Sequence, residues 1–81
     1  MKRIKLSYRE KEVLLFLAGS LTEAQVADKL GITPYTVHTH RTRIHKKLDA
    51  HWLIEAIGKA LFYKCITQQE WFISLASNGK L

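Results

Sequence analysis

The stretch from Thr33 to Leu48 predicts a long basic helix, and this helix constrains the remainder of the chain. Thr33-Pro34 is a helix-start signal, because a threonine hydroxyl accepts a hydrogen bond at the N-cap and proline suits the first helical position. At about 100° per residue, Val37, Ile44 and Leu48 fall on one narrow apolar stripe. The opposite face carries Arg, Lys, His and Thr side chains, with no Asp or Glu between residues 33 and 48. One face is therefore suited to packing, and the other to the phosphates or base edges of DNA.

A short helix and a tight turn precede this basic helix. Thr22 opens a capping box, so we expect a helix over residues 23–30. Ala27 within it is small enough to let a second helix cross closely. Gly31 can take a positive φ after the helix, and Ile32 is then expected in the core. A short helix, a tight turn and a long basic helix together indicate a helix-turn-helix.

Further helices are predicted on both sides of this unit. Ser7 and Thr67 each open another capping box, which predicts helices over about 8–18 and 68–77, and an apolar run predicts a helix over 52–66. The fold class is therefore all-α, a small helical bundle of four core helices with a fifth, C-terminal helix. The predicted organisation is a basic N-terminal arm at 1–6, the helix-turn-helix domain at 7–66 and a C-terminal helical extension at 67–81.

The composition favours a polyanionic partner. The 81 residues include 13 Lys and Arg against 7 Asp and Glu, which gives a formal net charge of +6. No apolar run is long enough to span a bilayer and no signal peptide is recognisable, so we expect a cytoplasmic protein with no membrane partner. Cys65 has no second cysteine for an internal disulfide and is expected to be a small core residue.

An enzyme or a metal site is disfavoured. A single small core leaves little room for a catalytic cleft. The chain has 4 histidines as candidate ligands, and none of them forms an i,i+4 pair on a helix. We therefore expect no catalytic residue, no metal and no cofactor.

Many positions between Leu6 and Ala60 follow one recognisable pattern. They are Leu6-Ser7, Arg9 to Leu14, Leu21-Thr22, Val26-Ala27, Leu30, Ile32, Thr36-Val37, His40, Ile44, Lys47-Leu48 and Glu55 to Ile57. A chain with these residues resembles the LuxR-type DNA-binding domain, also called FixJ-type, NarL-type or GerE-like. The resemblance implies a bacterial transcription regulator that binds double-stranded DNA on the nucleoid. It also implies that the helix at 34–48 enters the major groove and that the following helix forms a homodimer contact.

The resemblance also assigns roles to individual positions. Base contacts would fall to His38, Thr39 and Thr42, which the helical periodicity also places on the exposed face. Phosphate contacts would come from Thr22, Thr36, His40, Arg43 and Lys47, and the periodicity adds Lys46. His40 borders the packed stripe, so a partly buried imidazole with an accessible tip is expected. Arg41 borders the same stripe and is expected to be a packing or salt-bridge residue.

Some positions depart from the family pattern. Ser20 and Asp49 stand where glycine is usual, which puts the geometry of these loops in question. Leu15 and Leu53 add apolar surface where polar residues are usual, and the helix at 68–77 extends beyond the family's end. We expect this helix to cover some of that surface or to bind a partner. The predicted dimer or partner interface consists of Trp52, Leu53, Gly58, Phe62, Trp71 and Phe72.

Two alternatives remain open from the sequence. The promoter-binding helix-turn-helix of a sigma factor shares the Arg-Glu-x-Glu-Val-Leu start, although Lys47-Leu48 and Glu55 to Ile57 favour the LuxR type. A helix-turn-helix can instead serve as a protein-binding module that antagonises another regulator, through the apolar surfaces of the first, fourth and fifth helices. No receiver or ligand-sensing domain precedes the motif, so we expect a stand-alone domain, with a piece of a longer regulator as the other possibility.

Overall fold

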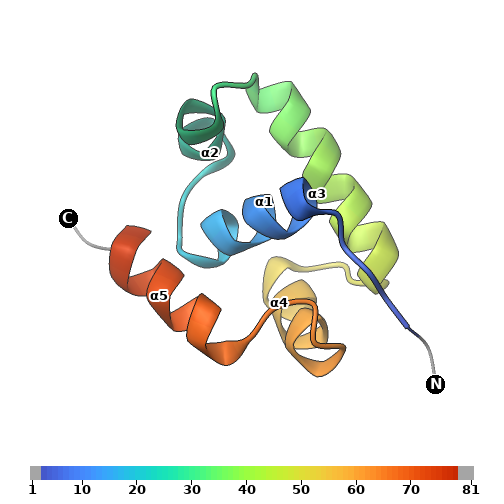
Figure 1. Cartoon of the computed structure of the whole chain (residues 1–81). Helices are drawn as coiled ribbons and strands as arrows, with labels where there is room; N and C mark the ends of the chain where they lie inside the picture. Colours follow the sequence, from blue (N-terminus) through green and yellow to red (C-terminus); the bar gives the residue numbers. More distant parts are fainter. Residues whose placement is uncertain (1–2, 79–81) are drawn as a thin grey trace.

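The computed structural model describes residues 3–78, and these residues form five α-helices and no strand. The helices are α1 (Tyr8–Ala18), α2 (Glu23–Leu30), α3 (Pro34–Leu48), α4 (Leu53–Phe62) and α5 (Gln68–Asn78). α1 is the central helix, and the other helices pack around it (Figure 1). The all-α prediction is confirmed. Residues 1–2 of the predicted arm and 79–81 of the predicted extension lie outside the described part of the chain.

Side-chain caps begin α1, α2, α3 and α5 as the sequence predicts, whereas α4 begins without one. Ser7 Oγ accepts from the Glu10 N–H at 3.1 Å while Glu10 Oε1 accepts from the Ser7 N–H at 2.9 Å. Thr22 and Thr67 open α2 and α5 with the same reciprocal pair of bonds. Thr33 caps α3 through the Thr36 N–H. Each cap satisfies backbone donors that the first helical turn leaves without intrahelical partners.

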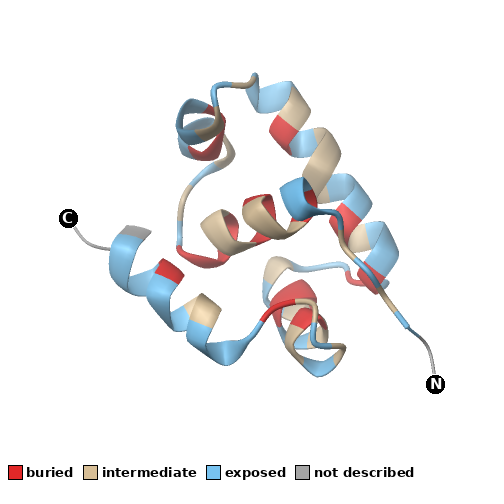
Figure 2. Ribbon diagram, in the orientation of Figure 1, coloured by how far each residue is buried: buried red, intermediate tan, exposed pale blue. Residues whose placement is uncertain are grey.

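The apolar stripe of α3 is buried against α1 and α2. Val37, Ile44 and Leu48 are fully buried, as is Ala27 at the crossing with α2. Figure 2 shows the buried positions of α1, α3 and α4 turned toward a common centre. The core comprises Val13, Leu14, Leu17, Ala18, Val26, Ala27, Val37, Ile44, Leu48, Ala50, Ala56, Ile57, Ala60 and Ile66. The predicted packed face of the basic helix is therefore confirmed.

Ser20 and Asp49 keep a glycine-like backbone although they carry side chains. Ser20 has φ 76° and Asp49 has φ 52°, both in the left-handed region, and Gly31 between α2 and α3 has φ 68°. The Asp49 N–H closes the end of α3 by bonding to the Lys46 carbonyl at 3.2 Å. The loops thus retain the left-handed turns, at a cost of about 1–2 kcal/mol for each residue that is not glycine.

α4 ends earlier than predicted. The sequence predicted a helix up to Ile66, but α4 stops at Phe62 because Lys64 adopts φ 62°. The Cys65 N–H then bonds back to the Ala60 carbonyl at 2.8 Å, which satisfies the end of the helix. Ile66 turns into the core from this non-helical segment. Its apolar character reflects core packing from a turn, which a helical pattern cannot distinguish from a continuing helix.

α5 packs on α1. The indole N–H of Trp71 donates to the Ala18 carbonyl at 3.2 Å, and the Ser74 hydroxyl donates to the Leu15 carbonyl. Lys11 and Glu70 form an ion pair at 2.9 Å beside these bonds. α5 therefore lies beside Leu15, which is half-buried. Trp71, predicted at an interface, packs inside the chain.

The N-terminal segment is partly held in place. Ile4 and Leu6 pack against the core, and the Cys65 thiol donates to the Ile4 carbonyl at 3.5 Å. Burial raises the pKa of the Cys65 thiol, which suits a packing residue more than a reactive one. Among residues 3–78, no helix is both long and apolar enough to cross a membrane.

We expect Trp71→Ala to lower the free energy of unfolding by about 2–3 kcal/mol, somewhat less than for a fully buried aromatic residue. The substitution removes the bond to Ala18 and the half-buried ring that joins α5 to α1. Urea denaturation measures the change. Phe72→Ala is the control, because Phe72 is exposed on the same helix, and it should cost no more than about 1 kcal/mol. Equal losses for the two variants would contradict the role given to Trp71.

Candidate nucleic-acid interface

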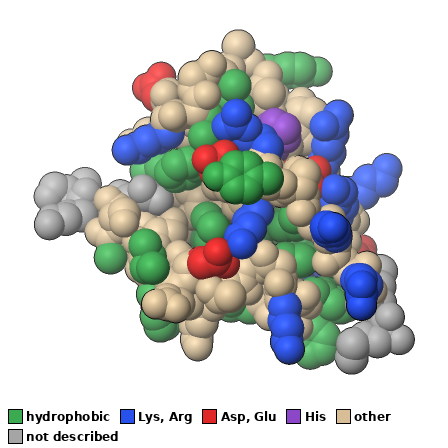
Figure 3. All heavy atoms as spheres, in the orientation of Figure 1, with side chains coloured by type: hydrophobic (Ala, Val, Ile, Leu, Met, Phe, Trp, Pro, Cys, Tyr) green, Lys and Arg blue, Asp and Glu red, His purple; other side chains and the backbone are tan. Residues whose placement is uncertain are grey.

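The face of α3 opposite its buried stripe is exposed and basic. Lys and Arg side chains gather along the side of the molecule where α3 lies (Figure 3). Thr42, Arg43 and Lys46 are exposed on this face, and the His38 side chain is 63% exposed. Thr39 is half-buried beside them. The sequence-predicted base-contacting residues thus share one accessible surface of one helix.

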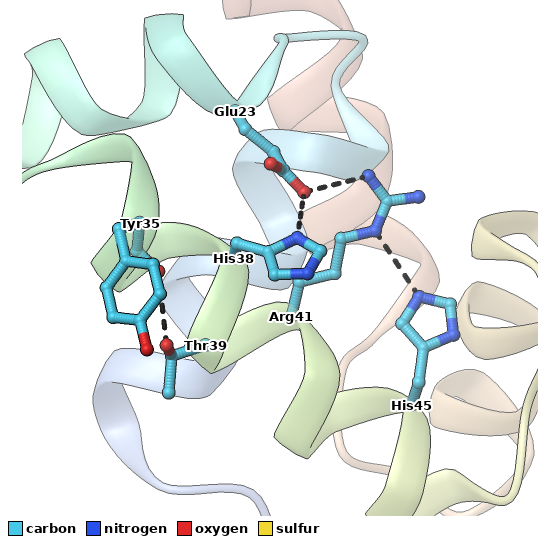
Figure 4. A network of polar contacts seen from close by, with 6 residues as sticks. All are labelled: Glu23, Tyr35, His38, Thr39, Arg41 and His45. Carbon is cyan, nitrogen blue, oxygen red and sulfur yellow. Dashed lines mark hydrogen bonds and ion pairs between the residues drawn. The ribbon is translucent and has the colours of Figure 1, made fainter.

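The hydroxyl of Thr39 is already engaged within α3. It donates to the Tyr35 carbonyl at 3.1 Å, one turn earlier (Figure 4). The Thr39 proton is therefore occupied, and the side chain presents its methyl group and oxygen lone pairs outward. A methyl group suits contact with the methyl of thymine, and a lone pair suits an exocyclic amino group of adenine or cytosine.

Glu23, at the first position of α2, connects α2 with the exposed face of α3. Its Oε2 accepts from His38 Nδ1 at 3.2 Å and from Arg41 Nη1 at 3.3 Å (Figure 4). The salt-bridge role predicted for Arg41 is confirmed. Glu23 was not among the residues predicted for this surface from the sequence. The signal in the sequence was an acidic residue in the first turn of one helix, followed by a second helix that contains no Asp or Glu.

Arg41 also bonds to His45, one turn further along α3. Its Nε donates to His45 Nε2 at 3.5 Å, and His45 Nδ1 bonds to the Ala50 carbonyl at 2.9 Å. Ala50 lies in the connection between α3 and α4. A continuous polar chain therefore runs from that connection through α3 to α2. Together with Thr42 and His51, these residues line an open hollow of about 470 Å³.

The predicted phosphate-contacting residues occupy different environments. Arg43 and Lys46 are exposed and form no ion pair among the described residues. Thr22 and Thr36 lie at the N-terminal turns of α2 and α3, where backbone N–H groups also face outward. His40 is half-buried as expected, and its Nδ1 is buried without a hydrogen-bond partner in the described part of the chain.

Lys47 lies on the predicted DNA surface and also contacts a buried carboxylate. Its Nζ lies 2.7 Å from Oε1 of Glu10, a carboxylate that is almost fully buried on α1. Burial raises the pKa of Glu10, but the bonds from Lys47 and from the Ser7 N–H, together with the Lys47 charge, bring it below its usual value. Lys47 is half-exposed, so it remains within reach of a phosphate although its charge is already partly balanced.

Two of the predicted interface residues, Gly58 and Phe62, form an exposed stripe on α4 together with Ile54, which was not predicted. Ile54, Gly58 and Phe62 follow one another at i,i+4 spacing, and Ile54 and Phe62 are 67% and 74% exposed. Gly58 has nothing within 4 Å of the position that a Cβ would occupy. Trp52, at the start of α4, is 71% exposed, whereas Leu53 is half-buried. Phe72 is exposed on α5.

Comparison with known proteins identifies the family of this chain. Residues 5–60 match the family described as bacterial regulatory proteins, luxR family. The chain belongs to this family. Its members are transcription regulators and not enzymes, and the domain is the helix-turn-helix formed here by α2 and α3. In residues 3–78 no group of three His, Cys, Asp or Glu side chains is arranged to hold a metal ion.

Curated relatives include several luxR-family regulators. The chain is 38% identical over 61 residues to the Fimbriae Z protein of Escherichia coli K12, covering 75% of this chain and 29% of that protein. It is 44% identical over 57 residues to the response regulatory protein YgeK of the same strain, covering 70% and 39% respectively. It is 41% identical over 61 residues to the transcriptional regulatory protein FixJ of Azorhizobium caulinodans, covering 74% and 29%.

The matched span covers less than two fifths of the length of each of these curated relatives. No solved structure matches the chain significantly.

From the Glu10–Lys47 contact we predict that this luxR-family domain loses stability as the pH falls. Because the folded-state pKa of Glu10 is lowered, its stabilising contribution is present above the ordinary glutamate pKa, about 4.3, and is lost as pH falls through the lowered value. We expect Glu10→Gln to flatten the fall in unfolding free energy below about pH 5. Urea titrations from pH 7 to pH 3 measure this. Glu12→Gln, on the same helix but half-exposed, is the control, and an equal flattening there would refute the assignment.

Proposed function

We propose that this chain is a sequence-specific DNA-binding transcription regulator that inserts α3 into the major groove. The observation that carries the proposal is an exposed, acid-free polar face on the second helix of a luxR-family helix-turn-helix. An α-helix fits the width of the major groove of B-DNA, where each base pair presents a distinct set of donors and acceptors. Such a regulator would act on the bacterial nucleoid, in the cytoplasm.

Base contacts are proposed for His38, Thr39 and Thr42, and phosphate contacts for the residues that surround them. The proposed base-contacting set carries imidazole and hydroxyl groups, which donate and accept hydrogen bonds. The proposed phosphate set consists of Thr22, Thr36, His40, Arg43, Lys46 and Lys47. Cationic members of this set would supply most of the sequence-independent affinity.

We further propose that the chain binds DNA as a homodimer through α4. The stripe of Ile54, Gly58 and Phe62, with Trp52 at its end, leaves apolar surface exposed on the isolated chain. A glycine in the middle of such a stripe lets a second helix approach closely. A two-fold dimer of this kind would place two copies of α3 on half-sites about one helical turn of DNA apart.

DNA affinity should fall at least about tenfold between 50 and 200 mM salt if several phosphates are neutralised. Lys46→Gln should weaken binding to all sequences alike and lower the salt slope by about 1. Thr42→Ala should instead relax preference at one base position by about 1–3 kcal/mol. Titration of a selected site and a scrambled site, followed by fluorescence anisotropy, separates the two effects.

Lys64→Gln is the matched control for charge, since Lys64 is exposed in the turn between α4 and α5, away from α3. The proposal fails if Lys64→Gln weakens DNA binding as much as Lys46→Gln does, or if the wild type distinguishes no sequence.

Ile54→Glu should raise the dimer dissociation constant by at least about tenfold, because a carboxylate would be desolvated opposite its own copy across the two-fold axis. Analytical ultracentrifugation of the free protein measures this constant. Ala76→Glu places the same charge on the exposed face of α5 and should leave association unchanged. A monomeric wild type, or equal loss in both variants, would argue against the α4 interface.

A protein-binding module is the second candidate. The observation that favours it is the amount of exposed apolar surface on α4 and α5, which includes Phe72 and Ile73 in addition to the α4 stripe. An antagonist would pair its α4 with that of another regulator. If α3 substitutions leave DNA binding unchanged while Ile54→Glu abolishes a complex with another luxR-family protein, this second function is the correct one.

A further inference from the structure

The hydrogen bonds of the polar chain between α3 and α2 determine which ring nitrogen of each of its histidines carries the proton. The Ala50 carbonyl can only accept a hydrogen bond, so His45 Nδ1, at 2.9 Å from it, must carry a proton. In neutral His45 the other nitrogen, Nε2, is then an acceptor. Nε2 accepts a hydrogen bond from Arg41 Nε–H at 3.5 Å. Arg41 must be the donor, because a guanidinium has no acceptor.

The same donor and acceptor rules locate the proton of His38. Arg41 Nη1 donates to Glu23 Oε2, and this oxygen also lies 3.2 Å from His38 Nδ1. An ionised carboxylate can only accept, so the proton between Glu23 and His38 sits on Nδ1 of the histidine. In neutral His38 the second nitrogen, Nε2, therefore has a free lone pair, on a side chain that is 63% exposed. Figure 4 shows both donors converging on the Glu23 carboxylate.

Glu23 is held in place by Arg41 while the His38 ring remains accessible. The Glu23 side chain is 29% exposed and anchored by Arg41, which is itself anchored by His45. His38 has no other hydrogen bond among the described residues. The proton position of this exposed ring therefore depends on one carboxylate from the neighbouring helix.

We propose that Glu23 is a specificity-determining residue that acts through His38. By holding the proton on His38 Nδ1, Glu23 makes Nε2 a hydrogen-bond acceptor toward the DNA. In the major groove the complementary donors are the exocyclic amino groups of adenine and cytosine, whereas guanine and thymine present acceptors at the equivalent edge. Glu23 thereby favours adenine or cytosine at the base that His38 contacts. The inference rests on the proposed function, since it concerns the same surface.

The proton position can be measured without DNA. Long-range ¹H–¹⁵N correlation spectra at about pH 8, above the ordinary imidazole pKa of about 6.5, distinguish the two neutral tautomers of a histidine. We expect His38 to carry its proton on Nδ1 in the wild type, and to exchange between both tautomers in Glu23→Ala. Glu23→Gln should preserve the wild-type state, because Arg41 can only donate and so orients the amide oxygen toward both donors.

Asp28→Ala is the matched control for this measurement. Asp28 is exposed on the same helix and bonds to neither His38 nor Arg41, so its removal takes away an equal charge and leaves the tautomer unchanged. An Nε2–H tautomer in the wild type, or no change in Glu23→Ala, overturns the inference. Thermal unfolding of each variant verifies that the fold is intact.

The consequence for specificity is measured on DNA at the same pH. Sites selected from random sequence by the wild type are permuted one base pair at a time, and His38→Ala identifies the position that His38 contacts. At that position we expect the wild type and Glu23→Gln to prefer adenine or cytosine by roughly fivefold, and Glu23→Ala by less than about twofold. All other positions should keep their preferences.

The outcomes separate this inference from the proposed function. If the wild type selects no DNA sequence, the proposed function fails and with it the specificity role of Glu23, while the spectra alone still test the tautomer. If the wild type is sequence-specific but prefers guanine at the His38 position, or if Glu23→Ala changes every position or none, the proposed function stands and the inference about Glu23 is refuted.

Discussion

The packing of α3 on α1 sets the position of the proposed DNA-binding face. Val37, Ile44 and Leu48 bury one side of a helix whose other side stays in water, so a single segment contributes both core and surface. Burying these side chains contributes about 1.5–3 kcal/mol each, a large share of the stability of so small a domain. This contact fixes the rotation of α3 about its axis. The rotation in turn decides which polar residues are presented outward.

Polar contacts refine this orientation at two places along α3. Lys47 reaches the buried Glu10 of α1 near the C-terminal end, and Arg41, in the middle of the helix, reaches Glu23 of α2. Surface ion pairs contribute little stability, but a carboxylate bonded to two α3 side chains restricts their geometry. Specific hydrogen bonding to a base needs such restriction, because a mobile side chain loses entropy when it binds.

The fifth helix shows how an extension changes a family domain. Leu15 adds apolar surface to α1, and α5 packs beside it through bonds from Trp71 and Ser74 to the α1 backbone. The matching region of the family ends before this helix begins, at residue 60. The α4 stripe remains uncovered among the described residues, so the chain's own extension does not compete with the proposed dimer surface.

The existence of the five helices, four of their caps and the packed side of α3 could be predicted from the sequence. These features depend on local hydrogen bonds and on a 3.6-residue period, both of which can be recognised in neighbouring residues, and the family resemblance followed from the same positions. The end of α4, the packing of α5 on α1 and the bonds of Glu23 to His38 and Arg41 could not be predicted in this way. The contacts of α5 and of Glu23 join residues that are distant in sequence, and no local pattern encodes the rotation of one helix against another. α4 ends where the chain turns Ile66 into the core, and a helical pattern cannot distinguish such a turn from a continuing helix.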